Sequence, residues 1–288
     1  MDNRPDWLKK KININNLNIA EIKNLIDNLK LHTVCQSAKC PNIFECFSKR
    51  TATFMLMGNI CTRNCAFCGV ESGIPEKLDS LEPEKIAKAV QNMGLKYVVL
   101  TSVTRDDLVD CGAEHFAKTV RMIKDVNPGS KIECLISDLN GRSGDLKKIM
   151  FSGIDVLNHN METIEAKYAT IRPQADYDRS LFILRTAKEM DPKINTKSGF
   201  MLGLGETRKD ISMLLKDLRK VNCDMVTIGQ YLSPTENNYP VKKYYRQEEF
   251  DEIKIEALEL GFKSVFSGIF VRSSYHAGEM LEKCDKKS

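Results

Sequence analysis

The chain of 288 residues is long enough for one large barrel or two ordinary domains, and its 42% hydrophobic and 28% charged residues are typical of a globular protein with a substantial core. Its formal net charge of +4 permits an acidic protein partner but is not the electrostatic footprint of a nucleic-acid-binding protein. No apolar stretch approaches the roughly 20 residues of a membrane span, and the first residues lack the apolar core of a secretory signal, so we expect a cytoplasmic protein that binds neither nucleic acid nor a membrane.

The first regular element that the sequence predicts is an amphipathic helix over residues 18–29. Its aliphatic side chains recur at helical spacing: Ile19, Ile22, Leu25, Ile26 and Leu29. The opposite face mixes both signs of charge, which is untypical of a membrane-surface helix. We therefore expect the apolar stripe to pack on the main domain.

A cysteine triplet follows, at the spacing C-x4-C-x5-C. Cys35, Cys40 and Cys46 fall within twelve residues that include one proline, so their thiols can wrap a single metal centre. The alternative is a helical turn with incidental thiols, but free cysteines rarely occur in threes at such short range. Six of the ten cysteines lie between Cys35 and Cys68, and in a reducing compartment such clustering indicates metal binding or catalysis rather than disulfides.

A second triplet, at the spacing C-x3-C-x2-C, follows an apolar run over residues 53–58 that predicts a strand ending in a loop. Its members are Cys61, Cys65 and Cys68. The alternatives are a zinc site or a group of buried thiols, but structural zinc sites usually pair two C-x2-C knuckles, and no second knuckle follows Cys68. The bacterial ferredoxin pattern does not match either. Three thiolates would leave one iron of a cubane cluster open, and an open coordination site is a reactive one.

Beyond Cys68, short apolar runs alternate with amphipathic segments. Together with the run before Cys61, they predict strands over residues 53–58, 97–102, 131–136, 154–158, 195–202, 225–229 and 264–267. The amphipathic segments predict helices over residues 83–93, 113–126, 144–151, 180–190, 208–221 and 250–260. These elements form six β/α units of an α/β fold with a parallel, barrel-like sheet. Six units rather than eight would leave the barrel open on one side.

The C-x3-C-x2-C motif resembles the signature of radical S-adenosylmethionine (SAM) enzymes, and with the triplet upstream of it the chain resembles the lipoyl synthase family. The words around the cysteines are similar too, and the resemblance extends from residues 5–8 to residues 272–277, nearly the whole chain. It implies a partial (β/α)6 radical-SAM barrel with extensions at both ends. The expected division is an N-terminal extension with the first triplet over residues 1–50, the barrel over residues 51–265, and a C-terminal extension over residues 266–288.

The resemblance also implies SAM and two [4Fe–4S] clusters as cofactors. A cluster on Cys61, Cys65 and Cys68 would split SAM to a 5′-deoxyadenosyl radical, which abstracts hydrogen from carbons 6 and 8 of an octanoyl chain. A cluster on the first triplet would donate both sulfur atoms and be consumed. The octanoyl chain would be attached to a lysine of a lipoyl-carrier domain, of the glycine cleavage H protein or 2-oxoacid dehydrogenase E2 type. The implied electron donor is a protein such as ferredoxin or flavodoxin.

In parallel α/β barrels, functional side chains gather where strands end. Thr101 and Ser102 end the second predicted strand and would accept the amino group of the methionine moiety of SAM; the alternative is the N-cap of a helix. Asn158, Asn160 and Glu162 follow the fourth strand and would hold the ribose hydroxyls or the carboxylate of SAM.

Four further positions are interpreted with the same resemblance. Arg172 is a candidate clamp for the carboxylate of SAM, because guanidinium binds carboxylate in a bidentate manner; the alternative is a surface arginine before a turn proline. Glycines within residues 203–207 would let the backbone approach adenine, or form a plain strand-to-helix turn. His159 is expected to be a hydrogen-bonded structural histidine, since hydrogen abstraction by a radical needs no base. Cys111 stands where the family has glycine, so a positive φ there would strain it.

A cluster on the first triplet needs a fourth ligand. In the resembled family a serine of the C-terminal Arg-Ser-Ser-Tyr motif fills this role, which implies Ser274, with Ser273 as the second choice. An alkoxide is a harder and poorer partner for iron than a thiolate, so the iron that it holds should be the easiest to release. The alternative is the N-cap of a helix over residues 275–283.

Two rival functions remain at this point. One is a radical SAM sulfur inserter of the biotin-synthase or methylthiotransferase type, which the serine motif and the first triplet argue against. The other is a cysteine-rich electron-transfer or metal-binding module, which predicts no cleavage of SAM and leaves the six β/α units superfluous.

Overall fold

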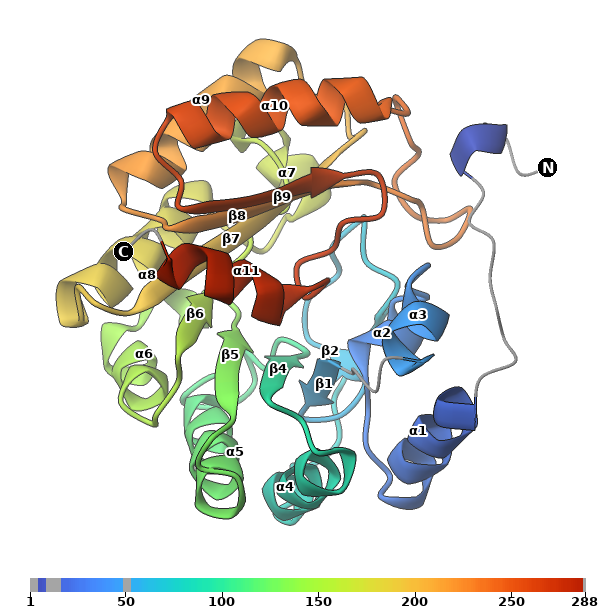
Figure 1. Ribbon diagram of the computed structural model, residues 1–288, viewed down its shortest axis with the longest axis vertical. Coiled ribbons are helices and arrows are strands. Elements are labelled where there is room, and N and C mark those ends of the chain that lie inside the picture. The colour runs from blue at the N-terminus through green and yellow to red at the C-terminus, as the bar shows by residue number, and fades with distance from the viewer. Residues whose placement is uncertain (1–4, 9–16, 49–52, 287–288) are drawn as a thin grey trace.

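The computed structural model describes residues 5–8, 17–48 and 53–286. Among these residues, seven parallel strands form one sheet in chain order, which curls from β1 at one edge to β9 at the other (Figure 1). The strands are β1 (Thr53–Leu56), β4 (Tyr97–Ser102), β5 (Lys131–Leu135), β6 (Val156–Asn158), β7 (Asn195–Leu202), β8 (Met225–Gln230) and β9 (Ser264–Gly268). Because β1 and β9 are not paired with each other, the barrel is partial, as expected.

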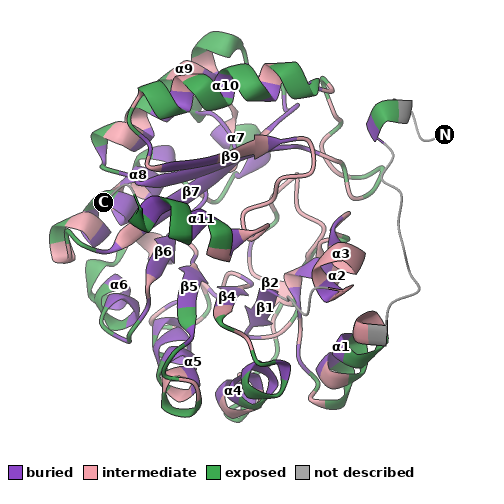
Figure 2. Cartoon of the chain, in the orientation of Figure 1, coloured by how far each residue is buried: buried purple, intermediate pink, exposed green. Residues whose placement is uncertain are grey.

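Helices cover the outer face of this sheet, so the strands are buried on both faces (Figure 2). Each connects two neighbouring strands as a β/α crossover. The covering helices are α4 (Glu82–Met93), α5 (Ala113–Val126), α6 (Ser143–Met150), α8 (Tyr177–Met190), α9 (Arg208–Lys220) and α10 (Gln247–Glu259). In α5, for example, Phe116, Val120 and Ile123 form the buried stripe at helical spacing.

Some predicted helix ends were wrong because capping side chains extend the helices. The carboxylate of Asp176 accepts a hydrogen bond from the backbone N–H of Arg179, so α8 begins at Tyr177 rather than at residue 180. A carboxylate oxygen of Glu249 accepts from the N–H of Arg246, and α10 begins three residues before the predicted start. The strand predicted over residues 154–158 begins only at Val156, since the segment before it makes a turn.

The N-terminal part of the chain precedes β1, and its helices between residues 17 and 48 flank that strand (Figure 1). It comprises η1 (Asp6–Leu8), α1 (Leu17–Asn28), α2 (Val34–Ser37) and α3 (Ile43–Ser48). The prediction of an amphipathic helix docked on the main domain is confirmed, because Ile22 and Ile26 of α1 are fully buried in the largest core cluster. The expected domain boundary after residue 50 lies outside the described residues.

The C-terminal helix α11 (Ala277–Asp285) packs against both β4 and β9. Its Met280, Leu281 and Cys284 form a core cluster with Val156 and Met225, the first residues of β6 and β8. The helix therefore lies at the amino ends of the strands, opposite the end at which a barrel places its functional side chains. It begins two residues later than predicted and its N-cap is His276, so the interpretation of Ser274 as an N-cap was wrong.

Several short elements complete the chain. They are β2 (Ile60–Cys61), β3 (Glu71–Ser72), η2 (Leu139–Gly141), η3 (Glu165–Lys167) and α7 (Tyr168–Ile171). A search of the described residues finds no helix with the length and apolarity that crossing a bilayer requires.

Candidate functional site

The second cysteine triplet lies in the loop between β1 and α4, at the carboxyl ends of the strands. Cys61, Cys65 and Cys68 are partly exposed and carry free thiols. Backbone N–H groups already point at two of the sulfur atoms: those of Arg63 and Thr104 at Cys61 Sγ, 3.4 and 3.3 Å away, and that of Val70 at Cys68 Sγ, 3.4 Å away. Hydrogen bonds of this kind stabilise thiolate charge and tune iron–sulfur clusters.

A buried arginine inside the motif anchors this loop. Arg63 is only 5% exposed and donates to both carboxylate oxygens of Asp106, at 2.7 and 2.9 Å, and of Asp138, at 3.0 and 2.7 Å. Asn140 accepts a further bond from the same guanidinium and donates to Asp106, at 2.9 and 3.0 Å. The carboxylates raise the pKa of Arg63, which overcomes the opposing effect of burial. The loop is therefore fixed to the ends of β4 and β5 by charge-assisted, bidentate bonds.

Two of the three thiols of this loop, those of Cys65 and Cys68, are protonated at neutral pH. Burial raises the pKa of Cys68 to about 12 and also raises that of Cys65. Since metals bind the thiolate form, loading of this loop must release protons. The N–H donors at Cys61 and Cys68 then compensate part of the negative charge.

Arg172 and Glu162 lie near the same loop, in which the N–H of Ala66 donates to the carbonyl oxygen of Ile171 at 2.9 Å. Arg172 counteracts the rise in the pKa of Cys65, whereas Glu162 adds to it, so both charges lie close to this thiol. Arg172 is 9% exposed and donates to the carbonyl oxygens of Asn160 and Met161, both at 3.0 Å. Its Nε is buried without a hydrogen-bond partner among the described residues. The alternative of a surface arginine is therefore wrong, because the side chain is aimed inward.

The other expected SAM contacts lie at the ends of β4 and β6. Thr101 and Ser102 are the last two residues of β4, opposite Met55 and Leu56 of β1. The helix that follows them, α5, has Gly112 as its N-cap, so the interpretation of Thr101 and Ser102 as a helix cap was wrong. Ser102 is partly exposed whereas Thr101 is 7% exposed, so the two hydroxyls differ in access to solvent.

Asn158 and Asn160 face the interior of the barrel. Asn158 donates to Glu133 at 2.6 Å and to the hydroxyl of Ser273 at 2.9 Å. Asn160 donates to Glu162 at 2.9 Å and accepts from Ser273 at 3.0 Å. These two side chains therefore connect the end of β6 with the C-terminal serine motif, a contact that the sequence did not indicate.

His159 is a buried structural histidine, as expected. It is 1% exposed, and its Nδ1 lies 2.9 Å from the carbonyl oxygen of Ile136, which fixes the neutral tautomer that donates from Nδ1. Burial, with the positive charge of Arg172, lowers the pKa of His159 from 6.5 to about 4.

The depressed pKa of His159 predicts an acid-sensitive fold. The unfolded imidazole binds a proton below pH 6.5 and the folded one only near pH 4, so the free energy of unfolding falls as the pH drops through this window. One such group contributes a slope of up to about 1.4 kcal/mol per pH unit. Urea unfolding of the wild type and of His159→Gln measures it, and the variant is expected to show the smaller slope. Equal slopes would contradict the assignment.

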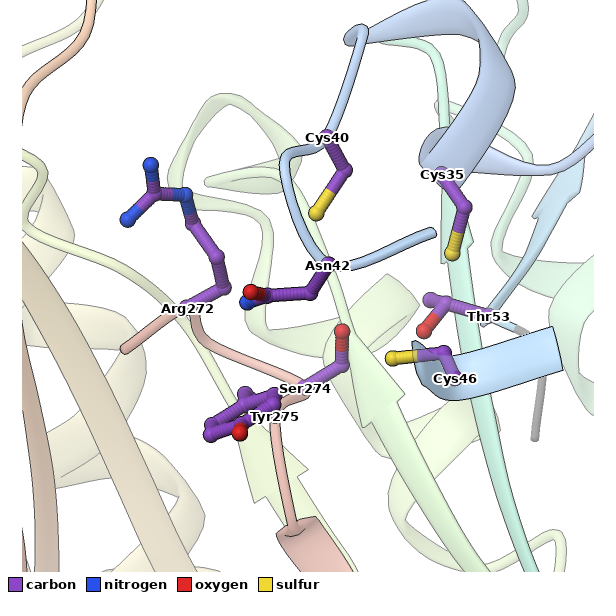
Figure 3. Close-up of a pocket in the computed structure, with 8 residues that line it drawn as sticks. All are labelled: Cys35, Cys40, Asn42, Cys46, Thr53, Arg272, Ser274 and Tyr275. Carbon is purple, nitrogen blue, oxygen red and sulfur yellow. The ribbon is translucent and has the colours of Figure 1, made fainter. Parts of the chain in front are cut away.

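The first cysteine triplet and Ser274 line one cavity (Figure 3). The thiols of Cys35, Cys40 and Cys46 and the hydroxyl of Ser274 point toward one another across this space, although Ser274 is more than two hundred residues away in the chain. Burial raises the pKa of Cys35 to about 11. In the described part of the chain, no three Cys, His, Asp or Glu side chains converge tightly enough to hold a single metal ion.

Two long-range hydrogen bonds hold the C-terminal segment against the N-terminal cysteines. Asn42, between Cys40 and Cys46, donates to the carbonyl oxygen of Phe270 at 2.7 Å. Tyr275 donates to Glu45 on α3 at 2.9 Å. The cavity is therefore enclosed by one segment from before the barrel and one segment from after it.

Gly229 of β8 lets this C-terminal segment approach the barrel. A Cβ at this position would overlap the carbonyl oxygen of Val271 and would lie 3.3 Å from the guanidinium of Arg272. Both partners belong to the segment that leads into Ser273 and Ser274. Only a residue without a side chain therefore keeps the serine motif in place.

Gly229→Ala is expected to displace the serine motif and to destabilise the chain by about 1–3 kcal/mol, because the added methyl group meets backbone rather than a flexible side chain. Urea unfolding of the iron-free chain measures the loss. Gly129→Ala is the matched control, since a Cβ there meets nothing within 4 Å. Equal midpoints for the two variants would show that the segment moves aside without cost.

Other sequence interpretations fare differently. Cys111 has a φ of 51°, so the expected strain at the position of the family's glycine is present. Residues 203–207 form a strand-to-helix turn in which Glu206 accepts from the N–H groups of Gly203 and Leu204, at 2.6 and 2.9 Å. Those two N–H groups are therefore already occupied.

Sequence reasoning also missed Arg63, although an arginine between two cysteines of a motif is a signal in itself.

A second feature that sequence reasoning missed is a buried ion pair inside the barrel. Lys197 of β7 and Glu133 of β5 are fully buried, with Nζ 3.0 and 3.1 Å from the two carboxylate oxygens. Tyr97 donates to the same carboxylate at 2.7 Å. The two charges lie in β5 and β7, on either side of β6, so neither has its partner near it in the sequence.

Comparison with solved structures shows the fold. The maturase HydG of the [FeFe]-hydrogenase is similar with a TM-score of 0.58 at 16% sequence identity, over 94% of this chain and 74% of that protein. Methylornithine synthase (PylB) is similar with a TM-score of 0.55 at 19% identity, over 86% of this chain and 74% of that protein. Residues 55–218, which contain the cluster loop and most of the strands, match the model of the radical SAM superfamily. The chain is therefore a radical SAM enzyme.

Its relatives among curated proteins narrow this class. The chain is 54% identical to a lipoyl synthase of Caldicellulosiruptor saccharolyticus over 276 residues. This aligned region covers 96% of each protein. It is also 50% identical to a lipoyl synthase of Bacillus mycoides over 286 residues. That aligned region covers 99% of this chain and 96% of the Bacillus protein. The chain belongs to the lipoyl synthase family.

This membership implies SAM and [4Fe–4S] clusters as cofactors, and the residues present fit them. Three thiols, two of which have N–H donors, lie on a partly exposed loop near an arginine whose Nε has no partner among the described residues. A second set of three thiols, with one serine hydroxyl, surrounds a cavity. Soft sulfur donors of this kind are the ligands that iron–sulfur clusters take.

Proposed function

We propose that this enzyme inserts two sulfur atoms at carbons 6 and 8 of an octanoyl chain held on a lipoyl-carrier domain. The observation that carries the proposal is the cavity in which Cys35, Cys40 and Cys46 meet Ser274, in addition to the cysteine loop of a radical SAM enzyme. One set of thiols serves radical formation and the other serves as the site of the sulfur source. When bound, the cofactors supply the radical that abstracts hydrogen and the sulfide that replaces it.

The loop of Cys61, Cys65 and Cys68 is the proposed site of the radical-forming cluster. Arg63 holds the loop rigid through Asp106 and Asp138, and the N–H groups at Cys61 and Cys68 stabilise the bound thiolates. A rigid loop keeps the position of the reacting atoms constant from one turnover to the next.

The mouth of the barrel opposite that loop is the proposed SAM site. Arg172, whose Nε has no partner in the described part of the chain, is suited to the carboxylate of SAM. Thr101 and Ser102 are proposed to accept hydrogen bonds from its amino group, and Asn158, Asn160 and Glu162 to bind its ribose or carboxylate. Asn160 and Glu162 are already joined by a hydrogen bond, so they would act as one unit.

The first triplet and Ser274 are proposed to hold the sacrificial cluster. Ser274 is favoured over Ser273 because its hydroxyl faces the three thiols, whereas the hydroxyl of Ser273 is occupied by Asn158 and Asn160. Serine oxygen is a weaker partner for iron than sulfur, so Ser274 would be the ligand from which iron is most easily released.

The proposed substrate is an octanoylated carrier domain of the glycine cleavage H protein or the 2-oxoacid dehydrogenase E2 type. The net charge of +4 would favour association with an acidic carrier. Burial of the octanoyl methylenes would contribute about 0.8 kcal/mol for each one removed from water. A ferredoxin or flavodoxin is the proposed electron donor.

The proposal is tested with anaerobically prepared protein, SAM, a reductant and an octanoylated carrier peptide. We expect about eight irons per chain, as two cubanes require, and mass spectrometry is expected to find a peptide that has gained two sulfur atoms. A product with a single sulfur atom, or with sulfur on another substrate such as dethiobiotin, would favour another sulfur inserter. Zinc in place of iron, with no cleavage of SAM, would favour the metal-binding module.

A further inference from the structure

The hydroxyl of Ser273 is part of a directional chain of hydrogen bonds through the barrel. Asn158 Nδ2 donates to Ser273 Oγ at 2.9 Å, Ser273 Oγ donates to Asn160 Oδ1 at 3.0 Å, and Asn160 Nδ2 donates to Glu162 Oε1 at 2.9 Å. Each of the first three side chains acts as donor in one bond, and the hydroxyl acts once as donor and once as acceptor. The pattern requires a group at this point that both donates and accepts, as a hydroxyl does.

The first end of this chain is fixed by the buried ion pair. Asn158 Nδ2 also donates to Glu133, which in turn is bound by Lys197, and all three residues are fully buried. Displacement of Asn158 Nδ2 would remove a donor from the buried carboxylate of Glu133, so the ion pair restrains this amide. Ser273 is thereby tied to a rigid part of the barrel.

The second end reaches the neighbourhood of the radical SAM loop. Glu162 has a φ of 64° and is held by backbone bonds to β7, from its N–H to Gly199 and from Met201 to its carbonyl oxygen, at 2.9 and 3.0 Å. The residues beside it are joined to the loop: Arg172 donates to the carbonyl oxygens of Asn160 and Met161, both at 3.0 Å, and the neighbouring carbonyl of Ile171 accepts from the N–H of Ala66 at 2.9 Å. The bond from Asn160 selects the orientation of the carboxylate of Glu162.

Ser273 and Ser274 lie at the tip of a turn closed by the N–H of Tyr275 and the carbonyl oxygen of Arg272, 3.0 Å apart. Because they are adjacent in this turn, the hydrogen bonds of Ser273 also restrain the backbone that carries Ser274. Ser273 faces the asparagines of β6 while Ser274 faces the thiols of Cys35, Cys40 and Cys46. The two serines of this motif therefore have different contacts: Ser273 with the asparagines, and Ser274 with the cavity of the first triplet.

We propose that Ser273 is a positioning residue that couples the two cysteine sites: it presents Ser274 to the first triplet and, through Asn160, orients Glu162 toward the radical SAM loop. This inference rests on the proposed function, in which both sites carry clusters. It assigns to the first serine of the motif a role distinct from that of a ligand.

The first test measures the iron site alone. In a Cys61→Ala background, Ser273→Ala is expected to release one iron to a chelator about tenfold faster than the parent, because the net effect of its two hydrogen bonds is of that size. With ferricyanide as the one-electron oxidant, the electron paramagnetic resonance signal of an oxidised three-iron cluster should appear at the same rate, and Ser273→Thr should behave like the parent. In a Ser274→Ala background, Ser273→Ala should add nothing, because its effect passes through Ser274.

The second test measures the SAM site alone. In a Cys46→Ala background and without octanoyl substrate, Ser273→Ala is expected to raise the KM for SAM about fivefold with little change in kcat of cleavage, since it misorients a binding group only. Unchanged iron release and unchanged KM would overturn the inference, as would a Ser273→Thr variant as defective as Ser273→Ala. Neither measurement uses a carrier, so a parent enzyme that forms no thiolated product would refute the proposed function separately.

Discussion

Cys46→Ala is expected to cleave SAM at a near-normal rate and to form no thiolated product, whereas Cys61→Ala is expected to do neither. The two cysteines belong to separate sites, because Cys46 lines the cavity with Ser274 and Cys61 lies in the loop after β1. Removing one of three thiolates opens a second coordination position, so the remaining two thiolates would not bind the cluster stably. Release of 5′-deoxyadenosine and mass spectrometry of the carrier peptide measure the two steps independently.

The matched control is Cys134→Ala, since Cys134 is a fully buried thiol of β5 that lines neither site. We expect it to lose stability through the small cavity that it creates, but to retain both activities in the folded fraction. If Cys46→Ala formed the fully thiolated peptide, the first triplet would not be the sulfur source. If it also failed to cleave SAM, the two sites would not be separable.

Arg63→Met is expected to produce the second largest effect, the loss of iron from the radical SAM loop together with about 3–5 kcal/mol of stability. The substitution keeps most of the aliphatic volume but leaves the fully buried carboxylate of Asp138 with one charged partner, Arg179, and one backbone N–H donor, that of Asn140. Removing one partner of a buried ion pair has a cost of this size. Iron analysis and urea unfolding of the iron-free chain measure the two losses.

The matched control is Arg121→Met, because Arg121 forms an exposed ion pair with Glu114 that contributes at most about 1 kcal/mol. We also expect the pH dependence of stability to change. Arg63 holds the pKa of Asp138 well below its usual range although burial would raise it, so the pair stabilises the fold above the unfolded pKa of Asp and less as the pH falls. A stable, iron-loaded Arg63→Met chain would show that the loop needs no anchor.

The fold was predictable because its signals are local. Alternating apolar runs and amphipathic segments identified the strands and covering helices, since burial on both faces of a parallel sheet leaves that pattern in the sequence. The first residues of α8 and α10 were harder to predict from the sequence, because the caps made by Asp176 and Glu249 extend these helices beyond their apolar stripes.

The candidate site was predictable only in part. Cysteine spacing identified both triplets, because a cluster requires several thiols close together in space and here each triplet is also close in sequence. The ion pairs by which Arg63 anchors the loop could not be predicted from the sequence, since its partners Asp106 and Asp138 follow different strands. The same applies to Lys197 and Glu133, which meet only when β5, β6 and β7 lie side by side.

The sequence by itself determined the parallel α/β architecture and the two sets of three thiols, because hydrophobic periodicity and ligand spacing act over short stretches of chain. Only the tertiary structure decided which hydroxyl of the adjacent pair Ser273 and Ser274 faces the first triplet. Two neighbouring serines are chemically identical, and what separates them is the turn at Arg272 and the pair of asparagines at the end of β6, both of which depend on packing between distant segments.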